Sequence, residues 1–373
     1  MSTSPTNLSQ HMSHSSRMER FEKASAALSL MNDDEVQKRL ERADTAYTGI
    51  GGTAVSLDIG GVRIFTKRVA ITRLEMLAEN LMSTRNIFEL PPSYHYGIVS
   101  LGFGAWRELA SHVMTTEWVR SQKCESFPLL YHSRILENQK RREPTAELKA
   151  ELSGILSYWN NLPSVSLRLS ELENSTTDLI LFLEHVPHNL FEWLNQYRDS
   201  SEDEISAACS MFERNLRREV PFMSSNGFFH LDAHSKNILT DGNALYFADF
   251  GLAMSTLFDL SSDEQEFAEH NQLHDLSHTI SQLVNWLVTT TGGTEARDVH
   301  HRNKLIALCA AGEEVEFTSK SAGSVIYRYA KIAHLFNDFY GKLFRGFAET
   351  PFPADQLRLA WSQLLHAESQ LGL

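Results

Sequence analysis

The sequence predicts an α+β protein in which a strand-rich first half is followed by a mainly helical second half. Two observations carry this prediction. Apolar residues alternate with polar ones over 55–59, and a Gly60-Gly61 turn joins this run to a second extended run over 62–67, which indicates a β-hairpin. From residue 187 onward the apolar spacing is helical, apart from one short hairpin.

Composition limits the class of protein. A chain of 373 residues is long enough for two lobes or two small domains, each with its own core. Its 34 basic and 47 acidic residues give a net charge of −13, which argues against nucleic acid and anionic membranes as partners. The cysteines, Cys124, Cys209 and Cys309, lie far apart without C-x-x-C spacing. A disulfide scaffold or zinc site is therefore not expected, and a reducing cytoplasm fits best.

Residues 1–44 are expected to be an extension that precedes the core. Roughly the first 17 residues are polar and Ser-rich, without the apolar stretch of a signal peptide or membrane span, and we expect them to be disordered. A secretion route that needs no such signal stays open. Residues 18–44 have apolar residues at helical spacing and predict one leading helix.

The region after the first hairpin mixes further strands with two long segments of other character. Residues 71–100 are interpreted as an insertion, and a helix with apolar periodicity starts at 104–110. The runs 127–136 and 179–183 are predicted strands. The charged segment 137–176 between them favours helix and is interpreted as a second insertion.

The most informative stretch reads HLDAHSKNIL over 230–239 and is followed by D-F-G, which begins at Asp249. Between them, two short apolar runs flank a Thr-Asp-Gly-Asn turn, which predicts a hairpin. This hairpin would bring Asp249 back beside Asn237. Two oxygen ligands held together in this way suit Mg²⁺, which takes its other ligands from water and phosphates. Asp232 would then lie nearby as a base.

These motifs resemble the catalytic core of the protein-kinase superfamily, whose loops read H-R-D-L-x-x-x-N and D-F-G. The resemblance implies that the chain binds ATP. It also implies that Asp232 accepts the proton of the attacking hydroxyl, while Asn237 and Asp249 hold the Mg²⁺ ions that bridge the phosphates.

The same resemblance implies a two-lobed, protein-kinase-like α+β fold. Residues 45–186 would form a β-rich N-lobe that contains both insertions, and residues 187–373 would form a helical C-lobe. Asp275 would be the buried aspartate that braces the catalytic loop.

Other parts of a phosphate-binding site have candidates in the N-lobe. Gly49, Gly51 and Gly52 form a Gly-rich turn between strands that loosely matches the kinase pattern G-x-G-x-x-G-x-V, although a plain hairpin turn fits as well. Lys67 ends the next strand, where kinases place the lysine of V-A-I-K; the alternative is a solvated strand lysine. Phe65, two residues earlier, is placed to stack on a base, as in the aminoglycoside enzymes.

The partner acid of Lys67 and the adenine-binding segment follow from the same resemblance. Glu108 begins the helix that precedes the next strands, so it is preferred as the partner acid over Glu75 and Glu79, with an exposed helix glutamate as the alternative. The segment after residue 179 resembles the kinase hinge, with Leu183 as gatekeeper and the backbone near Glu184 and Val186 pairing with adenine; a buried core strand is the alternative. The expected nucleotide-binding residues are therefore Gly49, Gly51, Gly52, Phe65, Lys67, Leu183, Glu184 and Val186.

The sequence leaves the phosphate acceptor open between a protein and a cationic small molecule. D-F-G is typical of protein kinases, so the leading hypothesis is transfer to a protein Ser/Thr hydroxyl. Leu231, where kinases carry Arg, and His234, in the pattern H-x-D-x-H-x-x-N, are closer to aminoglycoside and choline phosphotransferases. From Asp249 to His274, both included, there are six acids and no Lys or Arg, which would favour a cationic acceptor unless these acids form a solvated face. A nucleotide-binding pseudokinase or scaffold is the third hypothesis.

Overall fold

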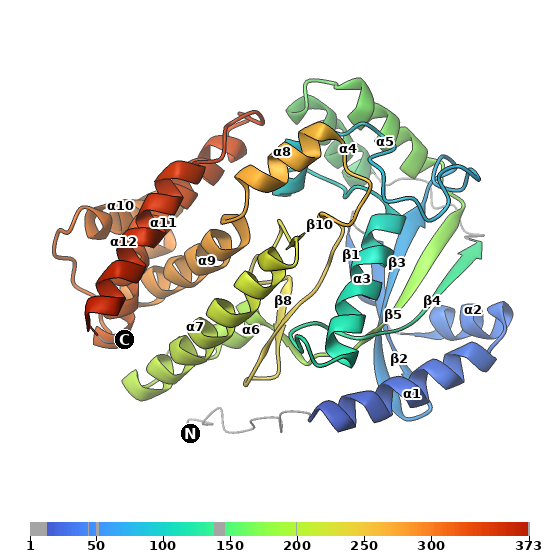
Figure 1. Ribbon diagram of the computed structural model, residues 1–373, viewed down its shortest axis with the longest axis horizontal. Coiled ribbons are helices and arrows are strands. Elements are labelled where there is room, and N and C mark those ends of the chain that lie inside the picture. Colours follow the sequence, from blue (N-terminus) through green and yellow to red (C-terminus); the bar gives the residue numbers. More distant parts are fainter. Residues whose placement is uncertain (1–12, 44, 50–51, 138–145, 199, 372–373) are drawn as a thin grey trace.

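The computed structural model describes residues 13–43, 45–49, 52–137, 146–198 and 200–371. These residues form an α+β arrangement in which one antiparallel sheet is followed along the chain by a mainly helical region (Figure 1). The predicted α+β class is therefore confirmed. None of the described helices is long and apolar enough to cross a membrane.

Two helices precede the sheet, where a single one was expected. Helix α1 (His14–Leu30) starts earlier than predicted, so the expected disorder of residues 14–17 is wrong; residues 1–12 lie outside the described residues. Helix α2 (Asp33–Arg42) follows after a short break. The break arises because Asn32 and Glu35 form a capping box that starts a new helix.

The sheet has five strands in the order β1-β2-β3-β5-β4, and each neighbouring pair is antiparallel. The two-residue turn of the predicted hairpin has positive φ at Gly60 (60°) and Gly61 (78°), a conformation that glycine adopts without strain. The strands are β1 (Thr45–Gly49), β2 (Gly52–Ile59), β3 (Val62–Ile71), β4 (Leu130–Glu137) and β5 (Thr177–Glu184).

Both predicted insertions contribute to one apolar cluster, which includes Tyr94 and Phe103 of the first and Trp159 and Leu169 of the second. The first spans 72–104 between β3 and helix α3 (Ala105–Arg120), and it contains the 3₁₀ helix η1 (Pro92–Tyr96). The second contains helices α4 (Ala146–Tyr158) and α5 (Pro163–Glu173), as its helix-favouring composition indicates. An apolar cluster joins one face of the sheet to α3; it includes Val69, Ile71, Trp106, Leu109, Leu181 and Leu183.

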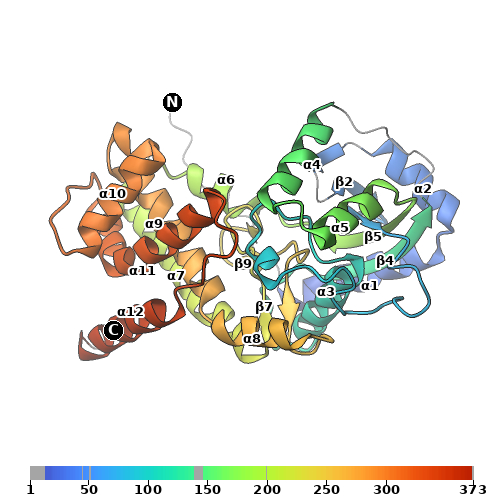
Figure 2. The same cartoon turned by 90° about the horizontal axis from the view of Figure 1, so that it is seen from above.

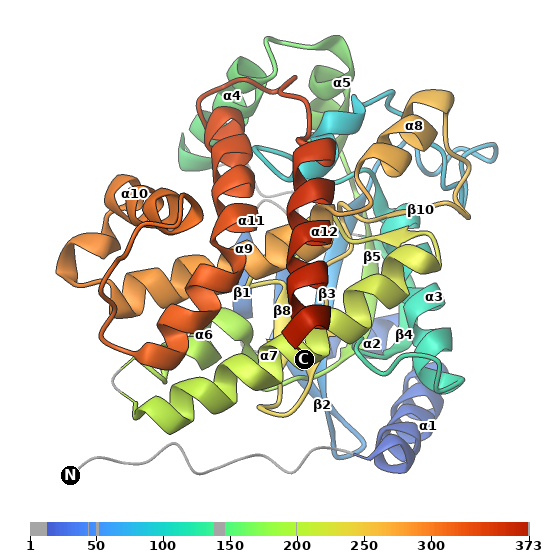
Figure 3. The same ribbon diagram turned by 60° about the vertical axis from the view of Figure 1, so that its left-hand side comes forward.

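The region after β5 is helical, and in Figure 2 its last helices lie at the opposite end of the molecule from the sheet. Figure 3 shows α11 and α12 side by side, and α11 packs on α7 and α9. The helices are α6 (Leu190–Asn195), α7 (Glu202–Ser225), α8 (Ser262–His270), α9 (His274–Thr291), η2 (Thr294–Arg297), α10 (Val299–Ala310), α11 (Lys320–Phe344) and α12 (Ala354–Leu371).

Short strands interrupt these helices and shape the loops that carry the motifs. The predicted hairpin is present as β8 (Ile238–Thr240) and β9 (Leu245–Phe247). Three further strands were not predicted because each has only two residues: β6 (His188–Asn189), which pairs with β8, and β7 (Phe228–Phe229), which pairs with β10 (Met254–Ser255). Cys124, Cys209 and Cys309 are buried and unpaired, as expected.

Helix α1 is fixed to the end of β5 by a buried ion pair. The guanidinium of Arg17 contacts the Glu184 carboxylate through Nη2 at 2.6 Å and through Nε at 3.0 Å. It also donates to the carbonyls of Glu125 and Phe127, so most of its hydrogen-bonding capacity is used. Both side chains are only 1% exposed. The N-terminal extension is therefore part of the core.

We predict that Arg17→Met lowers the free energy of unfolding by about 3–5 kcal/mol, because it leaves the Glu184 carboxylate buried without its cation. Urea denaturation monitored by circular dichroism measures this change. Arg20→Met, at an exposed position of the same helix, serves as the matched control and should change stability by less than about 0.5 kcal/mol. Equal losses in the two variants would contradict the prediction.

Candidate functional site

The loop that carries HLDAHSKN runs between β7 and β8, and Asp275 of α9 fixes its first turn. The Asp275 carboxylate accepts hydrogen bonds from the amides of His230 (2.6 Å) and Leu231 (2.7 Å). Leu231 has a φ of 63°, a left-handed conformation that is costly for leucine. The buried carboxylate holds the loop in this conformation, so Asp275 braces it as the sequence analysis expected.

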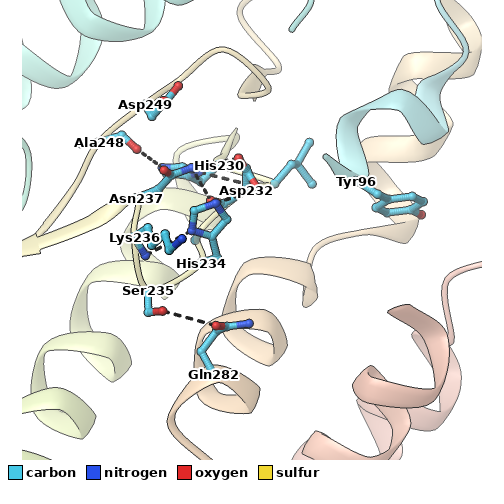
Figure 4. Close-up of polar contacts among 12 residues, drawn as sticks. Tyr96, His230, Asp232, His234, Ser235, Lys236, Asn237, Ala248, Asp249 and Gln282 are labelled. Atoms are coloured by element: carbon cyan, nitrogen blue, oxygen red, sulfur yellow. Dashed lines mark hydrogen bonds and ion pairs between the residues drawn. The ribbon is translucent and has the colours of Figure 1, made fainter. Parts of the chain in front are cut away.

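Asp232 lies at the centre of this loop and is held by Asn237 (Figure 4). The Asn237 Nδ2 donates to Asp232 Oδ2 at 2.8 Å and to the Asp232 carbonyl at 3.1 Å. Burial and the nearby negative charge of Asp249 raise the pKa of Asp232 well above its ordinary value, against the Asn237 hydrogen bond, which lowers it. This carboxyl therefore binds a proton more readily than an ordinary aspartate.

His234 flanks the same carboxylate, with Nε2 3.8 Å from Asp232 Oδ1. Burial and the charge of His230 lower the pKa of His234 to about 4, so its imidazole is neutral at pH 7. Lys236 is directed elsewhere, because its Nζ lies over the ring of Phe191, 5.9 Å from the centroid.

The β8–β9 hairpin returns the chain to Asn237 as predicted. The amide of Ala248 donates to the Asn237 carbonyl at 2.9 Å, so Asp249 follows directly beside Asn237. Asp249 has a φ of 66°, a second left-handed residue in this site. Its side chain is 49% exposed. Because the Asn237 amide nitrogen is engaged with Asp232, its Oδ1 and the Asp249 carboxylate remain as an oxygen donor set.

Lys67 of β3 joins two carboxylates that come from distant parts of the chain. Its Nζ lies 2.6 Å from Glu108 Oε1 and 2.8 Å from Asp249 Oδ1. Burial alone would lower the pKa of Lys67, but the two carboxylates outweigh it and raise the pKa. The surroundings of Asp249 disfavour its charge, yet Lys67 outweighs them and lowers the pKa of Asp249 to about 2. Burial raises the pKa of Glu108, although Lys67 opposes this.

The two glutamates that the sequence analysis set aside do not contact Lys67. Glu75 is buried and instead holds the start of α3, because its Oε1 accepts from the Ala105 amide at 2.7 Å and its Oε2 from the Thr72 amide at 2.8 Å. Glu79 is exposed. Glu108 is therefore the acid that the fold brings to Lys67.

Aromatic contacts also connect α3 to the motif loops, which the sequence analysis missed. The ring of Phe250 lies between His112 of α3 and His230, with centroid distances of 4.6 and 5.5 Å. His112 follows Glu108 by one helical turn, so the same face of α3 holds the ion pair and this contact. The spacing of four residues from Glu108 was the signal that would have identified it.

The residues expected to bind the nucleotide are only partly brought together. Phe65 lies opposite Leu183 in the β3–β5 pair, and both belong to the apolar cluster under α3. Gly49 pairs with Gly52 at the end of the β1–β2 hairpin, whereas Gly51 lies outside the described residues.

The contacts of Glu184, the last residue of β5, limit which backbone groups of this segment could pair with a base. The Glu184 amide is not free for a base, because it donates to the Leu129 carbonyl at 2.8 Å, and the Glu184 carboxylate is held by Arg17. Val186 is half-buried just beyond. Any base pairing with this segment would therefore have to use backbone groups other than the Glu184 amide.

The end of the first insertion crosses the site, and we call residues 92–104 the strap. A Cβ on Gly97 would lie 3.0 Å from Asp232 Oδ1, and a Cβ on Gly102 only 2.8 Å from the Gly251 carbonyl. The Phe103 amide donates to that same carbonyl at 3.1 Å. The close approach explains why glycine stands at positions 97 and 102.

The strap also contacts the helical region and encloses a cavity. Tyr96 donates to Asn271 Oδ1 at 3.0 Å, and its carbonyl accepts from Tyr340 at 3.2 Å. The cavity has a volume of about 150 Å³. Its walls are Lys67, Val69, Ser100, Leu101, Gly102, Gly104, Glu108, Arg168, Asp232, Asp249, Gly251 and Leu252.

Comparison with known proteins does not assign the chain to a family. No protein-family model matches the chain, and no curated protein matches its sequence. Among the residues that the structure describes, no group of three or more His, Cys, Asp or Glu is arranged to hold a metal ion. The function must therefore be argued from the geometry of the site.

We predict that Asp275→Asn lowers the free energy of unfolding by about 1.5–3 kcal/mol at pH 7, because an amide cannot accept from both loop amides as the carboxylate does. Burial opposes the charge of Asp275, but hydrogen bonds from its neighbours outweigh it and lower its pKa. A lowered pKa contributes stability above the unfolded-state value, so the difference should shrink as the pH falls through the folded-state pKa.

Denaturation curves of both proteins at several pH values measure this difference. Asp338→Asn, which removes an acid that is 53% exposed and paired with Lys342, is the control and should cost less than about 1 kcal/mol at every pH. A pH-independent loss in Asp275→Asn would mean that the carboxylate does not brace the loop through its charge.

Proposed function

We propose that this protein is an ATP-dependent phosphotransferase with a two-lobed, protein-kinase-like architecture. The observation that supports this most is the pair of contacts from Lys67 to Glu108 and Asp249, because a phosphotransfer site needs a lysine oriented by an acid beside the metal-binding aspartate. Along the chain, α3 lies between β3 and β4 of the sheet, and the region after β5 is mainly helical. This order agrees with the proposed N-lobe and C-lobe.

The donor set at the site fits magnesium. Mg²⁺ usually takes one or two protein oxygens and completes its shell with water and phosphates. The Asn237 Oδ1 and the Asp249 carboxylate have this chemistry, and Asp249 is exposed enough to reach a ligand. When bound, Mg²⁺ would neutralise phosphate charge during transfer.

The chain's own residues divide the remaining tasks. Lys67 would hold the phosphates of ATP, with Glu108 keeping its ammonium group in place. Asp232 would orient the acceptor hydroxyl and take its proton, and its raised pKa makes it a better base than an ordinary aspartate. Asn237 keeps the Asp232 carboxylate in one orientation. The site would lie in the cytoplasm, where ATP is abundant.

A protein Ser/Thr hydroxyl is the acceptor that the D-F-G motif favours, but one observation favours a small-molecule acceptor instead. The strap covers Asp232 at Gly97 and is tied to the helical region through Tyr96. An extended peptide would need this side of Asp232 to be open. Of the six acids from Asp249 to Glu269, Glu264 is not available to a cation, because it is buried against Arg107 at 2.7 Å.

We predict that purified protein with Mg²⁺ and γ-labelled ATP transfers phosphate, and that Asp232→Asn lowers the rate by about 10²–10⁴-fold while nucleotide binding stays intact. Labelled protein and released phosphate are measured in parallel with basic peptides, amino alcohols and amino sugars as acceptors. Asp338→Asn should behave as wild type. Label on the protein supports a protein acceptor, and stimulation by an amine supports the small-molecule alternative. Absence of nucleotide binding in the wild-type protein would refute the proposal.

We also predict that Gly97→Ala lowers transfer by about tenfold or more, because the new methyl group would press on the Asp232 carboxylate and shift it. Nucleotide affinity, measured by calorimetry, should change little. Gly312→Ala is the control, since Gly312 also has a positive φ, 81° against 73° for Gly97, but nothing lies within 4 Å of its Cβ position. Unchanged transfer in Gly97→Ala would show that the strap leaves Asp232 during the reaction.

A further inference from the structure

Arg168 is a buried cation in the wall of the cavity that contains Lys67, Asp232 and Asp249. It belongs to α5, in the second insertion, and its side chain is 2% exposed. Its Nη1 donates to Glu75 Oε2 at 3.2 Å, and its guanidinium lies over the ring of Phe88 at 4.7 Å. No part of the motif pattern pointed to this residue.

The hydrogen-bonding capacity of Arg168 is not used up by these contacts. A guanidinium carries five N–H donors, and buried arginines normally satisfy them. The Nε of Arg168 is buried and has no hydrogen-bond partner among the described residues. Planar donors with spare capacity at a cavity wall suit the oxygens of a phosphate, which guanidinium groups bind through two parallel hydrogen bonds.

The motif loop itself brings no cation to this cavity. Lys236, the lysine of that loop, lies over the Phe191 ring and is absent from the cavity wall. Of the described residues, only Lys67 and Arg168 contribute a basic side chain to that wall. Lys67 is already shared between Glu108 and Asp249. The negative charge of a transferring phosphate therefore lacks a cation from the loop.

We propose that Arg168 binds the γ-phosphate of ATP, so that the second insertion supplies the cation that the catalytic loop lacks. This inference rests on the proposed function. Glu75 positions the guanidinium through the ion pair, and because Glu75 also holds the first turn of α3 it connects Arg168 to the helix that carries Glu108. The insertion is then a functional part of the site.

The test compares nucleotides that differ in the γ-phosphate. Calorimetry with Mg²⁺ measures the affinities of the β,γ-imido analogue of ATP and of ADP for wild-type protein, Arg168→Gln and Glu75→Gln. Loss of a charge-assisted contact should weaken binding of the ATP analogue to Arg168→Gln by about tenfold or more and leave ADP within about twofold. Glu75→Gln removes the ion pair that positions Arg168 but keeps the guanidinium, so it should weaken binding of the ATP analogue less than Arg168→Gln does.

The double variant Arg168→Gln/Glu75→Gln keeps the test decisive if the single change prevents folding, because it leaves no buried charge unpaired. Its selective loss of the ATP analogue would support the inference. Equal weakening of both nucleotides, or no change in either, would overturn it and leave the proposed function standing. Failure of the wild-type protein to bind either nucleotide would overturn both.

Discussion

The site depends on one interaction, the shared contact of Lys67 with Glu108 and Asp249. The three residues belong to β3, α3 and the loop after β9, which are far apart in the sequence. The ammonium group lowers the pKa of Asp249 and opposes the rise that burial causes in the pKa of Glu108, while the two carboxylates together raise the pKa of Lys67. The relative positions of the sheet, the helix and the loop are therefore coupled through a few atoms.

The segments without motifs hold that arrangement in place. Arg107, next to Glu108, forms a buried ion pair with Glu264 of α8, so α3 is tied to the helix that follows the D-F-G loop. The strap hydrogen-bonds to Gly251 and to Asn271. Together these contacts hold α3 and the strap against the D-F-G loop and the helical region.

Residues of the site with a short-range pattern could be predicted from the sequence, whereas those set by long-range packing could not. The β8–β9 hairpin followed from a turn sequence between apolar runs, and it places Asp249 beside Asn237. The choice of Glu108 needed the order of helix and strands. The strap and Arg168 had no local signal, because their positions depend on how an insertion folds back over the site.

The boundaries of helices and short strands were also only partly predictable from the sequence. A capping box at Asn32 and Glu35 splits what apolar spacing alone presents as one helix, and both residues of the box can be recognised in the sequence. Two-residue strands such as β7 and β10 cannot be predicted from alternation, since two residues have no period. Tertiary neighbours, rather than intrinsic propensity, create them.

The ion pair between Arg17 and Glu184 has a consequence for how the molecule is divided. The motifs begin near residue 49, so a boundary drawn from them would discard α1 as a dispensable leader. Yet α1 supplies the counter-ion for an acid at the junction between the sheet and the helical region. The part of the chain that folds as a unit is therefore longer than the part that contains the motifs. A fragment that begins at the motifs would lack α1 and would expose the surface that α1 covers at this junction.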